Sequence, residues 1–84
     1  MLDGMPTYPS MKASKLFTLL GRELGYQEVR RQGSHRTLEA TGRPTLTFAF
    51  HQGVEIPPGL VRKILTKDAQ LTDEEAAALL GLRS

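Results

Sequence analysis

The sequence of 84 residues contains no cysteine. Disulfide bonds, thiolate metal sites and catalysis by a cysteine nucleophile are therefore excluded. No apolar run is long enough to cross a membrane, and the first residues, MLDGMPTYPSM, lack the basic and then apolar layout of a secretory signal peptide. We therefore expect a cytoplasmic protein that has no contact with a membrane.

Other signatures of site chemistry are also missing. The chain has two histidines, His35 and His51, with no cysteine and no clustered carboxylates to complete a metal site. No glycine-rich phosphate-binding loop is present, because the segment GSH at residues 33–35 is far too short for one. We therefore expect no metal and no small-molecule cofactor.

The net charge of +2 conceals an uneven distribution along the chain. Residues 12–36 hold six basic side chains against two acidic ones, whereas residues 67–84 hold two basic against four acidic. The basic residues of the first group are Lys12, Lys15, Arg22, Arg30, Arg31 and Arg36. A basic face indicates a polyanionic partner, most simply nucleic acid. The alternative is that these side chains are ordinary solvated surface.

Hydrophobic spacing predicts three helices. The first, SKLFTLLGRELGY, has apolar residues close to a period of 3.6, with Ser14 as the expected N-cap and Gly25, followed by Tyr26, as the stop. The second, LVRKILTK, follows Pro58, which suits the first turn of a helix. The third, in TDEEAAALLGL, opens with a capping box formed by Thr72 and Glu75 and stops at Gly81.

Three strands are predicted between the first two helices, from the segments YQEVRRQ, HRTLEA and TLTFAFH. The third alternates regularly between apolar and polar residues, whereas the first alternates imperfectly. The fold class is therefore α+β, with a three-stranded antiparallel sheet that has helices on one face and leaves the other face free. We expect residues 1–11 to form a flexible leader and residues 12–84 to form one domain.

The segment RRQGSHRTLEA at residues 30–40 holds the candidate site. Gly33 and Ser34 mark a tight turn, and the period of two in a strand places His35 on the face opposite Leu38. An imidazole exchanges protons near neutral pH, which suits RNA cleavage, and arginines can hold the phosphate being cleaved. The alternative for His35 is a polar residue bonded to the turn. His51 is expected to be a surface or loop-anchoring residue.

The segments SKLFTLL, GYQEVRRQGSHRTL and LTFAFHQGVEIPPGLVRKIL resemble the HicA family of toxins, over about residues 12–65 and more loosely to residue 80. These toxins are small mRNA interferases of HicAB toxin–antitoxin systems. The resemblance implies a fold like the double-stranded-RNA-binding domain, α-β-β-β-α, and here a short C-terminal helix follows it. It also implies that His35 is the catalytic histidine of a metal-independent endoribonuclease, with Gly33 and Ser34 shaping its turn.

The resemblance implies two partners, which are mRNA and a HicB-type antitoxin protein that masks the histidine. The residues expected to contact RNA phosphates are Arg30, Arg31, Arg36, Lys12 and Lys15. Two alternative functions remain. The first is a non-catalytic module that binds duplex RNA, for which the second helix offers only Arg62 and Lys63. The second is a pure protein-interaction partner that docks through its acidic C-terminal segment.

Overall fold

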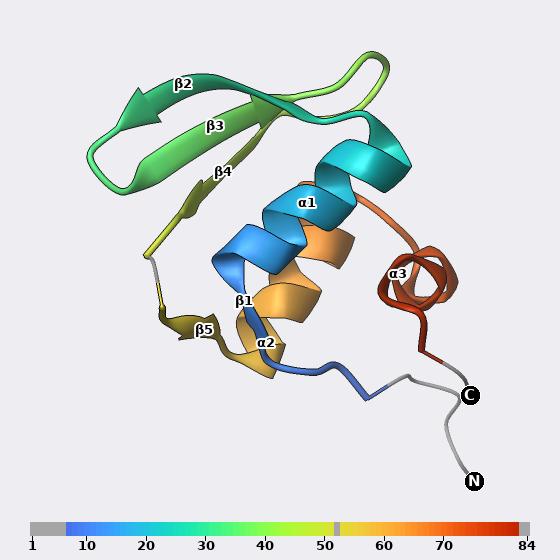
Figure 1. The fold of residues 1–84 in the computed structure, drawn as a ribbon. Coiled ribbons are helices and arrows are strands. Elements are labelled where there is room, and N and C mark those ends of the chain that lie inside the picture. Colours follow the sequence, from blue (N-terminus) through green and yellow to red (C-terminus); the bar gives the residue numbers. More distant parts are fainter. Residues whose placement is uncertain (1–6, 52, 83–84) are drawn as a thin grey trace, which may run out of the picture.

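The computed structural model describes residues 7–51 and 53–82 (Figure 1). The elements in chain order are β1 (Met11–Lys12), α1 (Ala13–Leu24), β2 (Gln27–Gln32), β3 (His35–Glu39), β4 (Leu46–Ala49), β5 (Glu55–Ile56), α2 (Pro58–Arg62), the π-helical segment η1 (Lys63–Asp68) and α3 (Asp73–Leu80). The strands β2, β3 and β4 form an antiparallel sheet in that order. The predicted α+β class and its α-β-β-β-α order, like that of a double-stranded-RNA-binding domain, are confirmed.

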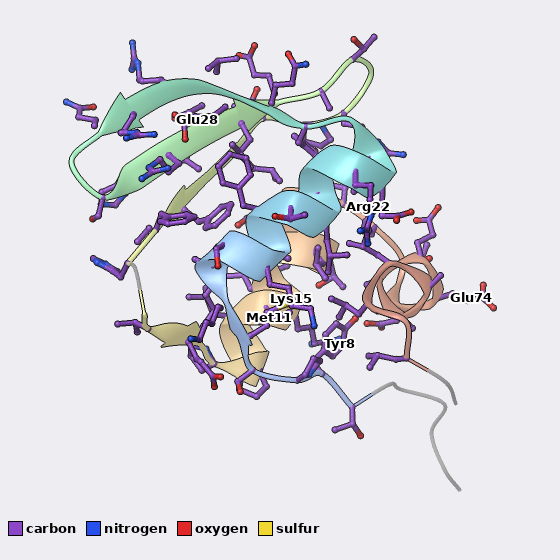
Figure 2. All side chains as sticks on the ribbon, in the orientation of Figure 1. Tyr8, Met11, Lys15, Arg22, Glu28 and Glu74 are labelled. Carbon is purple, nitrogen blue, oxygen red and sulfur yellow. The ribbon has the colours of Figure 1, made fainter. Side chains whose placement is uncertain are left out.

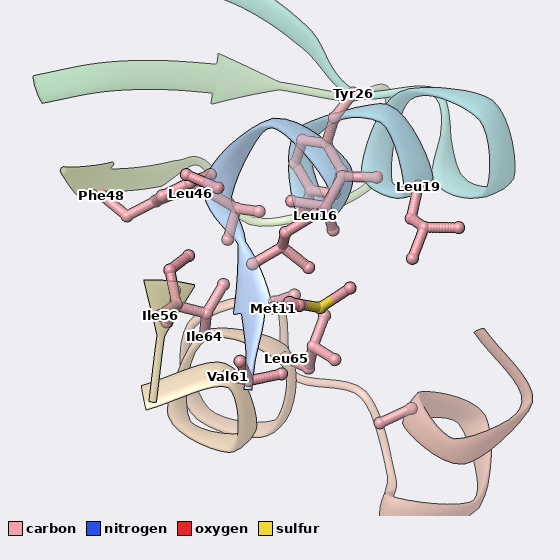
Figure 3. Packing of buried hydrophobic residues seen from close by; sticks show 14 of the residues in the cluster. Met11, Leu16, Leu19, Tyr26, Leu46, Phe48, Ile56, Val61, Ile64 and Leu65 are labelled. Carbon is pink, nitrogen blue, oxygen red and sulfur yellow. The ribbon is translucent and has the colours of Figure 1, made fainter. Parts of the chain in front are cut away.

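The helices lie on one side of the three-stranded sheet, and none of the described elements covers its other face (Figure 1). The buried apolar side chains fill the space between the sheet, α1 and the α2–η1 helix (Figure 3). The largest side chains that are completely buried are Leu16, Leu20, Leu38, Leu46, Val61, Ile64 and Leu65. Each such side chain contributes about 1.5–3 kcal/mol when it leaves water. One face of the sheet therefore packs against the hydrophobic core, while its other face stays accessible.

The strand β2 contains a bulge, which explains its imperfect alternation. Glu28 pairs with Leu38 and Arg30 pairs with Thr37, so Val29 lies between two paired residues without a partner of its own in β3. A bulge of this kind inserts one residue and shifts the alternation of every residue after it. Arg30 consequently reaches the outer face with Thr37, although it lies two residues from Glu28 on the inner face.

The helix α1 begins two residues earlier than expected. Lys12 is its N-cap and provides no side-chain hydrogen bond, whereas Ser14 lies inside the first turn. The prediction that Ser14 caps the helix is therefore wrong. The physical reason is that Lys12 is held in an extended conformation by pairing with Glu55, so the helix begins directly after it. The predicted end is confirmed, since Gly25 has a φ of 81° and donates to the carbonyl of Gly21.

The C-terminal helices follow their predicted signals. Pro58 occupies the first turn of α2, and the chain continues into η1, where the amide of Ala69 donates to the carbonyl of Ile64. Both hydrogen bonds of the predicted Thr72–Glu75 capping box are present at the start of α3. Within the described part of the chain, none of these helices combines the length and apolar character needed to cross a bilayer.

The packed part of the chain extends into the segment that the sequence assigns to a leader. Tyr8 and Met11 are buried members of the core cluster, and Met11 pairs with Ile56 of β5. The hydroxyl of Tyr8 donates a hydrogen bond of 2.7 Å to a carboxylate oxygen of Asp73. Local composition gave no signal for this packing, because it depends on partners more than forty residues away. Residues 1–6 of the expected leader lie outside the described residues.

Candidate functional site

The uncovered face of the sheet carries His35, the first residue of β3. His35 pairs with Gln32 on β2 and with Ala49 on β4. Residues that lie directly opposite each other in an antiparallel pair share a face, so these three residues form one row across the sheet. Both His35 and Gln32 are exposed. The imidazole is thus accessible to a large ligand that lies on this face.

A second polar row lies next to that of His35 and includes one of the predicted arginines. Arg30 pairs with Thr37, which pairs in turn with Thr47. The hydroxyl oxygens of the two threonines are 3.4 Å apart. Arg30 is exposed and lies on the same face as His35. This face therefore brings together an imidazole, a guanidinium and two hydroxyls.

The turn before His35 is formed by Gly33 and Ser34, as the sequence predicts. Gly33 adopts a φ of 61°, a left-handed conformation that glycine reaches without steric cost. The carbonyl of Ser34 accepts a hydrogen bond of 2.6 Å from the amide of Phe50, just beyond β4. The turn is thereby attached to the neighbouring strand, which fixes the position of the backbone at His35.

The structure separates Arg31 and Arg36 from His35, although the sequence groups them. The two arginines pair with each other across β2 and β3 and point to the covered side of the sheet. There the carboxylate of Glu28 accepts from Arg36 at 3.0 Å and from Arg31 at 3.3 Å. The Arg36 side chain is only 16% exposed, and its guanidinium carbon lies 4.3 Å from the ring centroid of Phe50. These contacts give Arg36 a clear structural role.

The two predicted lysines lie at the start of α1 and point to different places. Lys15 extends from α1 away from the three-stranded sheet (Figure 2). Lys12 lines a hollow together with Arg36 and His51, at the end of β4. Sequence reasoning did not bring these three residues together. No local signal could have done so, because the pairing of β1 with β5 and the end of β4 create the hollow.

The described residues contain no group of three or more histidine, cysteine, aspartate or glutamate side chains placed to hold a metal ion. The uncovered face instead offers proton transfer through His35 and positive charge through Arg30. Such a combination can move a proton at a phosphate ester and stabilise the charge that develops on it.

The fold and this face define a small α+β domain with the α-β-β-β-α order of elements and an exposed histidine. A family model described as the HicA toxin of bacterial toxin–antitoxin systems matches residues 13–71, well over half of the chain. The chain therefore belongs to the HicA toxin family: it is the toxin of a toxin–antitoxin system and has an antitoxin as its partner. No curated protein and no solved structure matches the chain.

Proposed function

We propose that this toxin is an endoribonuclease that cleaves mRNA and uses His35 as its single catalytic histidine. The observation that carries the proposal is the exposed imidazole at the start of β3, on the face of the sheet that no helix of the described chain covers. Membership of the HicA toxin family supports the same role, because a toxin needs a cellular target. The proposed target is the RNA backbone.

The reaction moves two protons, so His35 can transfer one of them near the ribose while water transfers the other. The 2′-hydroxyl loses its proton as its oxygen attacks the adjacent phosphorus, and the bond to the 5′-oxygen of the next nucleotide breaks as that oxygen gains a proton. The imidazole of His35 can accept the first proton or donate the second. General acid–base catalysis of this kind accelerates a reaction by about a hundred- to ten-thousandfold.

Arg30 is the proposed phosphate contact on the same face. Its guanidinium can donate two hydrogen bonds to phosphate oxygens, which orients the ester and stabilises negative charge in the transition state. The alternative of a non-catalytic duplex-binding module has weaker support. It would use basic residues at the second helix, but Arg62 forms an ion pair with Asp73 at 3.6 Å and Lys63 forms one with Asp68 at 3.1 Å.

Substitution of His35 with alanine tests the catalytic role. We expect His35→Ala to lower the rate of cleavage of a purified mRNA fragment by at least about a hundredfold, because the proton-transfer group is lost. The fold and the affinity for RNA should be nearly unchanged, since His35 is exposed and buries no apolar surface. The control is Lys67→Ala, an equally exposed change on η1. An unchanged rate in His35→Ala would remove the catalytic claim.

The proposed antitoxin is a HicB-type protein that covers the face around His35. Masking this face would block access of RNA without any change in the fold. Hydrogen exchange of the toxin alone and in complex with its antitoxin measures this directly. We expect slower exchange in the turn at Gly33 and Ser34 and along β3 when the antitoxin is bound. Protection confined to α3 would instead place the interface on the acidic C-terminal segment.

A further inference from the structure

A hollow of about 260 Å³ lies where the end of β4 meets the start of α1. Three basic side chains line it, those of Lys12, Arg36 and His51. The other described residues that line it are Ala13, Ser14, Phe50 and Gly53, none of which is acidic. We call this the basic hollow. It lies beside β4, which is an edge strand of the three-stranded sheet.

Arg36 forms a fixed wall of the basic hollow. Its guanidinium stacks on Phe50, and its Nη1 atom donates to Glu28 at 3.0 Å. Phe50 is itself packed edge-on against Phe17 of α1, with ring centroids 6.1 Å apart. The Nε atom of Arg36 is buried and has no hydrogen-bond partner among the described residues. Because Glu28 offsets part of the charge of Arg36, most of the available positive potential comes from Lys12. His51 adds ring nitrogens that can form hydrogen bonds.

Lys12 and His51 are both exposed, and neither forms an ion pair with another described residue. Glu55 lies opposite Lys12 in the β1–β5 ladder, but its carboxylate accepts a hydrogen bond from Ser10 and does not line the hollow. The first turn of α1 adds no acidic residue and no capping side chain. The first amides of a helix lack partners within it, so this end also favours an anion.

The backbone connects the basic hollow to His35. His35 pairs with Ala49, and the next two residues of the chain, Phe50 and His51, line the hollow. The amide of Phe50 donates to the carbonyl of Ser34, the residue directly before His35. Two residues of extended chain span about 7 Å. The two sites are therefore separated by a short step around an edge strand, with no other strand between them.

We propose that the basic hollow binds a backbone phosphate of the RNA strand, next to the phosphodiester that lies at His35. This assignment rests on the proposed ribonuclease function, and it identifies how the strand is held in register with the imidazole. Lys12 and His51 contact the phosphate, and Arg36 and the start of α1 fix the shape of the hollow. The proposed occupant is a phosphate of the RNA backbone. The NMR titration described below distinguishes it from free inorganic phosphate.

The experiment measures binding of a fluorescent 2′-O-methyl oligoribonucleotide, which cannot be cleaved because it lacks the attacking hydroxyl. Fluorescence anisotropy over a range of salt concentrations compares the wild type, His51→Gln and the double variant with Lys12→Gln. The charge-matched control is Lys67→Gln, on an exposed residue outside the hollow. We expect about a tenfold loss of affinity in the double variant and a salt dependence that is shallower by about one charge.

Several outcomes would overturn the assignment. If both hollow variants bind like Lys67→Gln, the basic hollow is not an RNA site, even if His35→Ala still abolishes cleavage. If the wild type does not bind the oligonucleotide, both the hollow and the ribonuclease proposal fall. If the wild type binds but does not cleave unmodified RNA, only the catalytic proposal falls. If the double variant unfolds, the exposed change His51→Gln decides alone.

A second measurement separates RNA from free phosphate. In amide NMR spectra of the wild type, titration with the oligonucleotide should shift the signals of Ala13 and Ser14, and these shifts should disappear in the double variant. Shifts with inorganic phosphate but none with the oligonucleotide would show an anion site unrelated to RNA and would overturn the proposal.

Discussion

At the scale of single residues, the two faces of the sheet divide the arginines that are neighbours in sequence. Arg30 shares the outer face with His35, because the bulge at Val29 shifts the alternation of β2. Arg31 points to the other side and contacts Glu28. Consecutive basic residues therefore lie on opposite faces of the sheet and have different surroundings.

This division predicts different effects for two matched substitutions. We expect Arg30→Gln to weaken binding of a 2′-O-methyl oligoribonucleotide several-fold and to reduce the salt dependence by about one charge, because a phosphate contact is lost. Arg31→Gln should change the affinity by less than about twofold. Fluorescence anisotropy at several salt concentrations measures both. Equal effects of the two substitutions would contradict the separation of the two faces, and a flat salt response would place the RNA elsewhere.

The candidate site was predictable from the sequence only in part. The position of His35 followed from the period of two in a strand, and the turn at Gly33 and Ser34 followed from its composition. The face of the sheet on which Arg30 lies could not be predicted, because a bulge in β2 has no local sequence signal that distinguishes it from an irregular strand. The role of Arg36 was also hidden, since its partners Glu28 and Phe50 lie on two other segments.

At the scale of elements, local signals predicted the elements that depend on local chemistry. Two helices end at Gly25 and Gly81, and α3 begins with the Thr72–Glu75 capping box. Each of these features depends on contacts between residues close in sequence. The pairing of β1 with β5 was missed, because each strand has two residues and exists only when it meets the other. The same pairing sets the start of α1 and places Lys12 at the basic hollow. The position of Lys12 therefore could not be predicted from the sequence either.

At the scale of the whole molecule, the segment before the family match and the segment after it contact each other. The match spans residues 13–71, and Tyr8 and Asp73 lie on either side of it. The Tyr8 hydroxyl donates to Asp73, which also forms an ion pair with Arg62. An N-terminal segment and α3 thereby close around the domain on the side of α1 that faces away from the sheet (Figure 2). This contact stabilises the scaffold without entering the uncovered face of the sheet.

Because of this contact, we expect the free energy of unfolding to fall at alkaline pH. Burial and the neighbouring carboxylate of Asp73 raise the pKa of Tyr8 from 10.0 to about 12. Because the folded pKa is the higher one, the stabilisation is complete below pH 10 and is lost as the pH rises towards 12. We expect Tyr8→Phe to lower the free energy of unfolding by about 1 kcal/mol at pH 7 through loss of the hydrogen bond.

Urea unfolding of the wild type and Tyr8→Phe, repeated between pH 7 and pH 12, measures both effects. The wild type should lose its advantage over the variant as the pH passes from 10 to 12. A difference that stays constant across this range would mean that the Tyr8 hydroxyl does not titrate in contact with Asp73. RNA cleavage at neutral pH should be unchanged in Tyr8→Phe, since Tyr8 lies far from the uncovered face in the fold.

The chemical identity of the cleaved ends tests the central claim most directly. A defined RNA is incubated with the wild type and with His35→Ala in the presence of EDTA, and the products are identified by mass spectrometry. We predict that the wild type produces a 2′,3′-cyclic phosphate and a 5′-hydroxyl, and that His35→Ala produces neither at a comparable rate. Cleavage by His35→Ala at the wild-type rate, or 5′-phosphate ends that appear only with added metal, would contradict the account.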